Sequence, residues 1–423
     1  MKKLLLLSLA AVCIAACGKA PKEENQAEQT YSPGAVSIYG TAAENTSSSA
    51  SIKMFKQDKV FEAYLSISAG TLTIADENGK LWALKEGGVL ERAEGSVSIG
   101  SLGSPCRLRL DFGEMKWQAI AIKRVSLQSV SSDSENIVLT YDKLGRWKAS
   151  DFYYASSYTD YIFRVETDSP SELYAWVPGP DGNLVGVGES AASAAVSFTM
   201  DESVSRDKVC PSIDMNNGRS QSFDTQPREI NAIFVGDSIT NLWTKTDASF
   251  FTDNGYIGRG VDGLISSLVK SRFQNDVIAD MPYVAHIMCG TNDVAENGGS
   301  YVESSEVVAN IAEMAELAFN NGIYPVIGSV LPCKYFYWRG ESWSPSKPGV
   351  TVPSHIIEIN NLLKSYCAEK GFTFVDYYSI LVNTEDYSFP LSIDGCHPAL
   401  AAYLKMEARA KTAITSNLPA NQR

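Results

Sequence analysis

The pattern of hydrophobic and polar positions changes its period once along the chain. From about Ser37 to Thr199, apolar and polar residues alternate, as in residues 106–112, CRLRLDF, which is typical of half-buried β-strands. Two short apolar stretches in this part flank Asn78-Gly79, a dipeptide that favours a tight hairpin. Because no helical period appears here, the pattern predicts an all-β region of one or two antiparallel β-sandwiches.

A different pattern follows Glu229, where short apolar segments alternate with stretches of helical period. In one such stretch, apolar residues recur every three or four positions from Val307 to Leu317, and Gly322 ends the helix. The alternation of strand and helix predicts an α/β fold, a flavodoxin-like parallel sheet between two layers of helices. In such sheets, ligands bind beyond the carboxyl ends of the strands. The predicted strands are Ile230–Val235, Tyr283–Met288, Tyr324–Val330 and Phe372–Val375.

The first residues have the pattern of an export signal. Lys2 and Lys3 precede an apolar stretch, residues 4–12, which is followed by the sequence IAAC ending at Cys17. This sequence resembles the bacterial lipobox, in which the cysteine is acylated and becomes the mature N-terminus. The apolar stretch is shorter than the ~20 residues that span a bilayer. We therefore expect a lipid anchor on Cys17 and a place in the bacterial cell envelope, at the outer membrane and either periplasmic or surface-exposed.

These patterns divide the chain into five parts. We expect a signal peptide at 1–16, a flexible tether at 17–33, the β-sandwich region at 34–205, a polar linker at 206–228 and the α/β domain at 229–418. Glycan binding is one hypothesis for the β-sandwich region, although no motif in it is specific. Core packing is favoured over sugar stacking for its tryptophans. They are Trp82, Trp117, Trp147 and Trp176.

Composition narrows the partners and the chemistry. The chain has 423 residues, 44% of them hydrophobic, which is enough for more than one core. Its formal net charge is −13 and no long Lys/Arg run follows the first residues, so nucleic acid is not an expected partner. The cysteines beyond Cys17 are scattered without a C-x-x-C pair, so we expect no metal site and leave disulfide pairing open. They are Cys106, Cys210, Cys289, Cys333, Cys367 and Cys396.

One stretch carries candidate chemistry, residues 233–240 with the sequence IFVGDSIT. Ser238 stands where the first strand of the predicted parallel sheet ends and a helix begins, so its hydroxyl faces the crevice at the sheet edge. Backbone N–H groups at such a helix start favour a developing negative charge. A serine hydroxyl alone is a poor nucleophile. Ser238 is therefore a candidate nucleophile that needs a base at the same edge.

The chain has only 3 histidines, so the candidates for that base can be exhausted. His286 lies inside a predicted strand and is expected to be a satisfied core residue. His355 lies in the first turn of a predicted helix and is most simply a surface residue. His397 lies in the sequence DGCHP, on the loop before the last helix, and Asp394 can turn back to accept its Nδ1–H. His397 is therefore the predicted base, oriented by Asp394.

Acyl transfer also needs donors for an oxyanion, and three groups can supply them. Asn292 follows the second predicted strand in the sequence CGTND, and Gly260 offers a backbone N–H without a side chain. Together with the Ser238 N–H, they form the predicted oxyanion hole. Residues 258–263 also match the dinucleotide fingerprint G-x-G-x-x-G, but they do not follow a good first strand, so no cofactor is expected.

Taken together, the blocks around Ser238, Gly260, Asn292 and His397 resemble those of the SGNH hydrolases, also called GDSL esterases. The resemblance covers about Glu229 to Ile414. The chain is similar to the branch of this family that resembles platelet-activating-factor acetylhydrolase. It differs at Asp262, in a region where relatives often carry glycine. The resemblance also includes Asn310-Ile311, Tyr337-Trp338-Arg339 and Val375-Asp376-Tyr377-Tyr378.

The resemblance implies a serine esterase that is acylated on Ser238 and freed by a water that His397 deprotonates, without metal or cofactor. Relatives act on acetylated polysaccharides, lipids, thioesters and small aryl esters. With a lipid anchor and an added β region, the expected substrate is an O-acetylated glycan or a small ester. The alternatives are a lipid acylhydrolase and a non-catalytic surface glycan-binding lipoprotein, and intact Ser238, Asp394 and His397 argue against the latter.

An aromatic loop follows the third predicted strand of the α/β domain and is expected to border the site. It spans residues 333–343, with the sequence CKYFYWRGESW. Trp338 and Trp343 are the candidates for contact with substrate, because the C–H face of a sugar stacks on a flat π surface. The alternative is that these rings only pack the loop.

Overall fold

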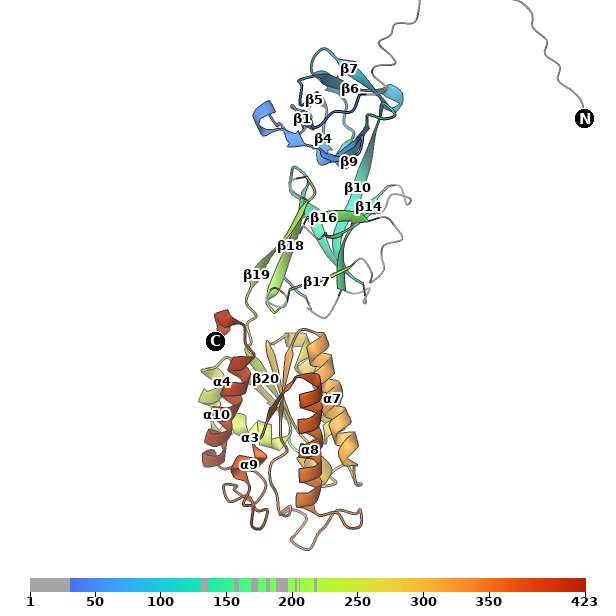
Figure 1. Cartoon of the computed structure of the whole chain (residues 1–423). Coiled ribbons are helices and arrows are strands. Elements are labelled where there is room, and N and C mark those ends of the chain that lie inside the picture. The colour runs from blue at the N-terminus through green and yellow to red at the C-terminus, as the bar shows by residue number, and fades with distance from the viewer. Residues whose placement is uncertain are drawn as a thin grey trace, which may run out of the picture. The chain divides into compact units, whose positions relative to one another are not determined.

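The computed structural model divides the chain into two compact units, Met1–Ala121 with Lys143–Gly145, and Ile122–Asp142 with Arg146–Arg423 (Figure 1). The predicted signal peptide, Cys17 and most of the predicted tether lie outside the described residues. The structure describes residues 31–130, 136–155, 160–168, 174–179, 183–187, 197–201, 204, 206–216 and 219–423.

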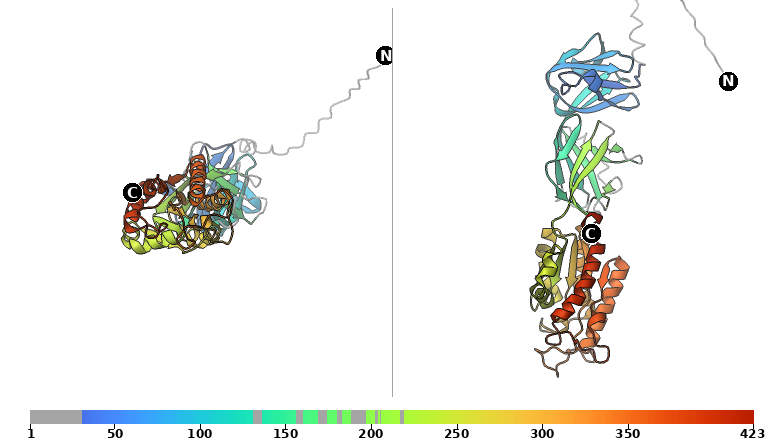
Figure 2. Two further views of the ribbon diagram at one scale, coloured as in Figure 1. Left: turned by 90° about the horizontal axis from the view of Figure 1, so that it is seen from below. Right: turned by 90° about the vertical axis from the view of Figure 1, so that its left-hand side faces the viewer.

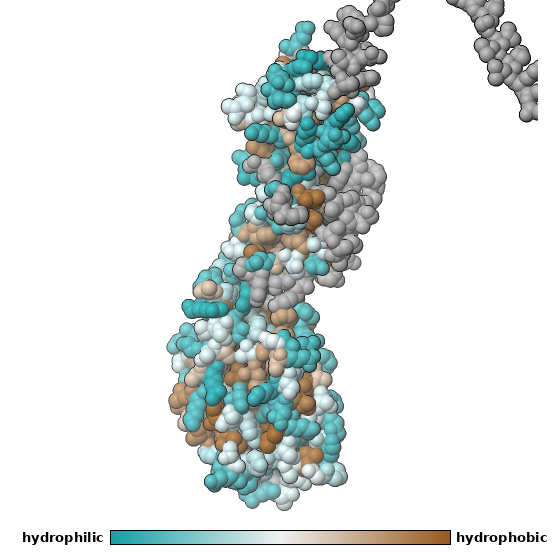
Figure 3. Space-filling model, in the orientation of Figure 1, coloured by the Kyte–Doolittle hydropathy of each residue, from teal (hydrophilic) through white to brown (hydrophobic). Residues whose placement is uncertain are grey.

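The first unit is built from antiparallel strands around its own hydrophobic core. The predicted hairpin is confirmed: β5 pairs with β6, Ile74 opposite Trp82, and Gly79 has the positive φ of 75° that the turn requires. The face of this unit seen in Figure 3 is largely hydrophilic. Its strands are β1 (Val36–Tyr39), β2 (Ile52–Lys53), β3 (Phe55–Gln57), β4 (Val60–Ile67), β5 (Gly70–Asp76), β6 (Leu81–Lys85), β7 (Val89–Ala93), β8 (Val97–Ile99), β9 (Gly103–Asp111) and the first part of β10 (Lys116–Ser129), with short 3₁₀ turns η1 (Ser48–Ala50) and η2 (Glu86–Gly88).

The second unit begins with another set of antiparallel strands. Residues 206–228, expected to be a linker, instead contain the hairpin β18–β19, whose first strand pairs with β12 and β13. Val209 and Ile213 are buried in it, but the polar residues around them hide the strand period in the sequence. The strands are the rest of β10, β11 (Asn136–Tyr141), β12 (Arg146–Ala149), β13 (Tyr153–Tyr154), β14 (Asp160–Thr167), β15 (Tyr174–Pro178), β16 (Leu184–Val187), β17 (Phe198–Thr199), β18 (Lys208–Asp214) and β19 (Ser220–Gln226).

The rest of the second unit is the predicted parallel sheet between two layers of helices (Figures 1 and 2). Its strand order is β21-β20-β22-β23-β24, and every pair is parallel. Ile233 and Val235 of β20 pack under α5, α7 and α8, whereas Phe234 packs under α3, α4 and α10. The strands are β20 (Ala232–Gly236), β21 (Tyr256–Gly260), β22 (Val284–Met288), β23 (Tyr324–Gly328) and β24 (Thr373–Val375).

The helices of this part follow the predicted pattern, with some ends displaced. The helix predicted from the period around Val307 is α7. Helix α8 is capped by Thr351, whose hydroxyl accepts from the Ser354 N–H. The helices are α3 (Ser238–Thr246), α4 (Ala248–Thr252), α5 (Ser266–Asp276), α6 (Thr291–Val294), α7 (Ser304–Asn320), α8 (Val352–Lys370), α9 (Tyr378–Leu381) and α10 (Leu400–Ser416), with 3₁₀ turns η6 (Ile278–Asp280) and η7 (Ala420–Gln422).

Strand β21 was not predicted, because its glycines have the composition of a turn. The two glycines serve close packing against α3 instead. A Cβ on Gly258 would lie 2.0 Å from Thr244 Oγ1, and one on Gly260 would lie 2.3 Å from the backbone nitrogen of Asn241. The strand therefore needs glycine where the helix that begins at Ser238 crosses it.

The prediction that His355 lies at the surface is wrong. Its side chain is 0% exposed and its ring stacks on Tyr301, with the ring centroids 4.8 Å apart. His355 precedes Ile359 and Leu363 by four and eight residues, so it shares their buried face of α8. Burial lowers the pKa of its imidazole.

The scattered cysteines lie in the interior of the protein. Each cysteine from Cys106 onward is buried and carries a free thiol. In the part of the chain that the structure describes, no helix is long and apolar enough to cross a membrane.

Candidate active site

Ser238 is the first residue of α3, directly after the carboxyl end of β20. A Cβ on Gly236 would lie 2.1 Å from the carbonyl oxygen of Met288 in β22, so only glycine fits between the two strands. Asp237 is the N-cap of α3, and its Oδ1 accepts a hydrogen bond from the Ile239 N–H at 3.0 Å. The sequence Gly-Asp-Ser thus ends the strand, caps the helix and leaves the serine at its first turn.

Ser238, His397 and Asp394 form one hydrogen-bonded chain. Ser238 Oγ lies 2.9 Å from His397 Nε2, and His397 Nδ1 lies 2.7 Å from Asp394 Oδ2. The other oxygen of Asp394 accepts the backbone N–H groups of His397 and Cys396 at 2.8 and 3.0 Å. The loop before α10 is therefore folded around the carboxylate, and the structure brings together the three residues that the sequence singled out.

Two carboxyl groups beside this chain have opposite pKa shifts. Burial alone would raise the pKa of Asp394, but the hydrogen bonds from His397 and Cys396 outweigh it and lower the pKa, which keeps Asp394 ionised. Asp237 is 1% exposed, and burial raises the pKa of its carboxyl to about 7. Among the described residues, its Oδ2 atom has no hydrogen-bond partner.

His286 occupies the core position expected of it. It is 0% exposed, its Nε2 lies 2.8 Å from the Tyr377 hydroxyl, and its ring stacks on Phe234 with centroids 4.3 Å apart. Burial lowers the pKa of its imidazole to about 3, so His286 stays neutral.

Asn292 faces the same cavity as Ser238 from the first turn of α6. Its Nδ2 donates one hydrogen bond to the Leu264 carbonyl at 3.1 Å, which leaves a second N–H for another acceptor. Asn297 Nδ2 donates to Asn292 Oδ1 and so fixes which end of the amide is the donor. Asn292 is thus held in an orientation that suits the predicted oxyanion donor.

The turn that carries Asn292 is anchored from below by Asp293. Its carboxylate accepts from the Ser266 N–H at 2.8 Å and from the Ser266 hydroxyl at 2.7 Å. Asn310 Nδ2 in turn donates to that hydroxyl at 3.0 Å. Burial raises the pKa of Asp293 to about 6. Asn310, part of the family resemblance, therefore supports the site through Ser266 without facing the cavity.

Gly260 lies at the carboxyl end of β21, opposite Gly236 in β20. Its close approach to the start of α3 explains the glycine, whereas the cavity wall on this side is formed by the next residues, Asp262 and Gly263. Asn241 Nδ2 donates to the Asp262 carboxylate at 2.6 Å. The role of the Gly260 N–H as an oxyanion donor stays a prediction.

The cavity has a volume of about 500 Å³, and its lining mixes polar and apolar side chains. Trp338 forms part of its wall: its ring centroid lies 6.1 Å from that of His397, and its Nε1 lies 3.4 Å from Asn297 Oδ1. Trp338 thus borders both the imidazole and the amide that orients Asn292. The lining residues are Ser238, Leu242, Asp262, Gly263, Asn292, Asn297, Tyr337, Trp338, Ile393, Asp394 and His397.

The loop that carries Trp338 is tied to the loop that carries Asn297. Arg339 Nη2 donates to the Glu296 carbonyl at 2.8 Å, and the Ser346 N–H and hydroxyl both donate to Glu296 Oε1, at 2.6 and 2.9 Å. Glu296 is only 8% exposed and has a positive φ of 53°. These contacts hold the two loops as one wall.

Trp343, the second aromatic candidate, packs under this loop instead of lining the cavity. Its ring contacts Phe336, with centroids 6.0 Å apart, and the Arg339 guanidinium lies 5.3 Å from its centroid. Trp343 also packs against the hydrophobic core of the α/β part. Of the two alternatives for the loop, Trp343 fits loop packing, whereas Trp338, 38% exposed, is open to a ligand.

The chain matches no protein-family model and no curated protein. Solved structures are similar to it over nearly half its length. A GDSL-like lipase from Bacteroides thetaiotaomicron VPI-5482 is 40% identical, and the match covers 44% of this chain and 88% of that one, with a TM-score of 0.41. Over this part, the chain belongs to the GDSL-like lipase family.

Two further solved structures have similar coverage. A candidate acylhydrolase from Bacteroides fragilis NCTC 9343 is 36% identical, covering 45% of this chain and 88% of that one, with a TM-score of 0.41. An acetyl-xylooligosaccharide esterase from Geobacillus is 18% identical, covering 43% of this chain and 93% of that one, with a TM-score of 0.36.

Sequence reasoning missed the residues that hold the GDSL site in place. Asn297 lines the cavity and orients Asn292, but it stands in a glycine-rich loop whose fold has no period to reveal it. Ser266 accepts and donates at the start of α5, which the sequence does not mark as close to Asp293. Both residues act through contacts between segments that are far apart along the chain.

Proposed function

We propose that the chain is a serine esterase that hydrolyses O-acyl esters, chiefly O-acetyl esters on carbohydrate. The observation that carries the proposal is the unbroken chain from Ser238 Oγ through His397 to Asp394, with contacts of 2.9 and 2.7 Å at the edge of an open cavity. Membership of the GDSL-like lipase family supports ester hydrolysis as the reaction class.

The mechanism follows from the roles that these contacts allow. Ser238 Oγ attacks the acyl carbon while its proton passes to His397 Nε2, and Asp394 stabilises the imidazolium. The ester C–O bond breaks and the alcohol leaves with that proton. A water then gives its proton to His397 and attacks the acyl carbon, which releases the acid and frees Ser238. The N–H groups of Ser238 and Asn292 stabilise the oxyanion in both steps.

The polar groups in the lining of the cavity support a hydrophilic substrate. Asp262, Asn292 and Asn297 present charged or amide groups to it, and burying these groups against a long acyl chain would cost free energy. Trp338 offers a partly exposed ring beside His397, where a sugar ring could stack while its acetyl group reaches Ser238. An acetyl ester on a glycan fits both features better than a lipid does.

A series of aryl esters tests the acyl preference. We expect kcat/KM to fall steeply from acetate to butyrate to octanoate, and acetate to be released from acetylated xylan. Ser238→Ala is the control for background hydrolysis. An optimum at octanoate would instead indicate a lipid acylhydrolase, which gains about 0.8 kcal/mol for each buried CH₂.

We further propose that the enzyme is held in the bacterial envelope by lipid on Cys17. The support is the charged, apolar and IAAC sequence pattern at the N-terminus. Cys17→Ser should move the protein from the membrane fraction to the soluble one, because the acyl chains supply the anchoring free energy. Retention in membranes after a high-salt wash would contradict this.

A further inference from the structure

The cavity beside Ser238 carries more negative charge than the proposed mechanism uses. Two carboxylates line it, Asp262 and Asp394, and no lysine or arginine is among the described residues that line it. Asp394 has a role in the mechanism, because its Oδ2 lies 2.7 Å from His397 Nδ1 and faces the imidazolium that forms there. Asp262 has no such role. Its charge is therefore available to act on whatever enters the cavity.

The carboxylate of Asp262 is held close to the nucleophile. Asn241 Nδ2 donates to its Oδ1 at 2.6 Å, and Asn241 stands three residues after Ser238 in α3. Residues so spaced are neighbours on one face of a helix, with Cβ atoms ~5–6 Å apart. Leu242, the next residue of α3, also lines the cavity. Physiological salt, with a Debye length of ~8 Å, screens a charge only in part over such a separation.

No basic side chain offsets this charge. Among the described residues, Asp262 forms no ion pair and its contact with Asn241 is to a neutral amide. Lys245 lies at the far end of α3 and outside the lining. The other basic residues of the segments that border the cavity are each joined to an acidic residue elsewhere. They are Arg259 with Asp280 and Lys334 with Asp386, as ion pairs, and Arg339 with Glu296, through the Glu296 carbonyl.

We propose that Asp262 sets the charge preference of the esterase, which favours esters of neutral or cationic alcohols and disfavours esters of anionic ones. This rests on the proposed function, in which the acyl group is acetyl and only the alcohol can carry charge. An anionic alcohol, such as a uronic acid, is repelled by the unpaired carboxylate, whereas a cationic one is attracted. The substrate class is then an acetylated neutral or amino sugar rather than an acetylated acidic one.

Pairs of esters that match in shape and differ in charge test this. Acetylthiocholine is compared with its neutral isostere, the thioacetate that has a tert-butyl group in place of trimethylammonium. The anionic ester is para-acetoxybenzenesulfonate, and its neutral partner is para-acetoxybenzenesulfonamide. The readout is the charged-to-neutral ratio of kcat/KM at low ionic strength. Comparing this ratio between the parent and each variant cancels the intrinsic reactivity of the esters and any general change in activity.

Asp262→Asn keeps the shape of the side chain and an oxygen for Asn241 but removes the charge. It should lower the cation-to-neutral ratio and raise the anion-to-neutral ratio, each by roughly three- to tenfold. Asp262→Lys should move both ratios further in the same direction. Asp262 is exposed, so both variants should keep the melting temperature of the parent. High salt should shrink the difference between the parent and Asp262→Asn.

Asp253→Asn is the matched control. It also removes one negative charge from an exposed position, but Asp253 follows α4 and precedes β21, so it lies at the opposite edge of the sheet from the cavity. Both ratios should stay at their parent values. The proposal is overturned if Asp262→Asn and Asp262→Lys both keep the ratios of the parent. It is also overturned if Asp253→Asn changes them as much as Asp262→Asn does.

The same assay separates this proposal from the proposed function. If the parent hydrolyses the neutral esters faster than Ser238→Ala but the ratios do not respond to Asp262, only the charge preference is wrong. If the parent hydrolyses neither neutral ester faster than Ser238→Ala, the esterase function is wrong, and the charge preference is overturned with it.

Discussion

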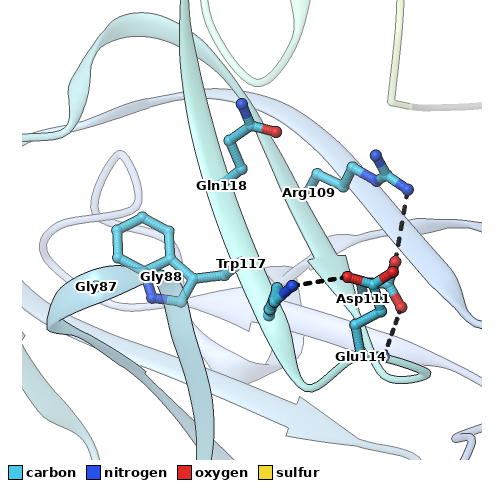
Figure 4. Close-up of a pocket in the computed structure, with 8 residues that line it drawn as sticks. Gly87, Gly88, Arg109, Asp111, Glu114, Trp117 and Gln118 are labelled. Carbon is cyan, nitrogen blue, oxygen red and sulfur yellow. Dashed lines mark hydrogen bonds and ion pairs between the residues drawn. The ribbon is translucent and has the colours of Figure 1, made fainter.

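The two cavities of this chain hold their polar groups in different ways. In the α/β part, Asp394 and Asn292 are fixed by hydrogen bonds from backbone and neighbouring amides. In the first unit, a cavity beside η2 is lined by Arg109 and Lys116, which form ion pairs with Asp111 and Glu114 at 3.5 and 3.0 Å (Figure 4). Rigid support suits groups that must meet a developing charge at a set distance, whereas ion pairs open to water add only about 0–1 kcal/mol to stability. The contrast separates a cavity built for chemistry from one whose charged groups are loosely held.

The largest loss of activity should follow from removing His397, the central residue of the hydrogen bonds that join Ser238 to Asp394. His397→Ala removes the base, so kcat/KM on aryl acetate should fall by roughly 10³-fold or more. Asp394→Asn should be milder, because the imidazole remains beside Ser238. His286→Ala is the comparison at a histidine outside the cavity, and it should reduce stability more than the activity of the folded enzyme. Equal activity in His397→Ala and the parent would contradict the assignment.

The next largest loss of activity should follow from changing Asn292, the predicted oxyanion donor, or Asn297, which orients it. Asn292→Ala should lower kcat by about 10²–10³-fold, the usual loss for one oxyanion donor. Asn297→Asp keeps the shape of Asn297 but cannot donate to Asn292 Oδ1, so kcat should fall by roughly tenfold while KM stays near the parent value. Steady-state kinetics on aryl acetate measures both. A rise in KM alone for Asn297→Asp would indicate a substrate contact rather than support of Asn292.

The free energy of unfolding should depend on pH differently for Asp237, the buried N-cap of α3, and for Asp247, the N-cap of α4. The folded-state pKa of Asp237 is about 7, well above the 3.8 of an ordinary aspartate, so the folded state holds a proton that the unfolded state releases. Its contribution to stability is therefore fully present at low pH and is lost as pH rises through about 7. Asp237→Asn does not titrate, so its stability relative to the parent should increase by on the order of 1–4 kcal/mol between pH 4 and 8.

Urea unfolding at several pH values measures this difference, and Asp247→Asn is the matched control. Asp247 also caps a helix, α4, but hydrogen bonds from Ser249 and Phe250 lower its pKa. Its replacement should therefore lose stability relative to the parent as pH rises through the acidic range. A parallel pH response of the two variants would contradict the burial of an unpaired Asp237.

The smallest effect should be a loss of stability on replacing His355. Because its ring is wholly buried against Tyr301, His355→Ala should lower the free energy of unfolding by about 1–3 kcal/mol through the cavity it leaves. His355→Leu should cost less, since among the described residues neither ring nitrogen has a hydrogen-bond partner to lose. Chemical denaturation measures both variants. Unchanged stability in His355→Ala would mean that the site is not packed as described.

The sequence predicted the α/β fold and brought Ser238, Asp394 and His397 to one edge because strand ends and a short list of histidines constrain them. It could not reveal β21, whose glycines allow close packing against α3. It also missed the hairpin at 206–228, because the buried residues of β18 do not alternate with exposed ones. Asn297 was beyond reach for a related reason. Its role depends on a contact with Asn292 that local patterns do not record.

The central claim is that Ser238 is the nucleophile, and covalent labelling tests it most directly. The purified chain is treated with a fluorophosphonate, digested and analysed by mass spectrometry, with His397→Ala and Ser238→Ala treated in parallel. We predict stoichiometric label on the peptide that contains Ser238, loss of aryl acetate hydrolysis in step with labelling, and little or no label in either variant. Full labelling at another residue, or labelling of Ser238 that leaves hydrolysis intact, would contradict the account.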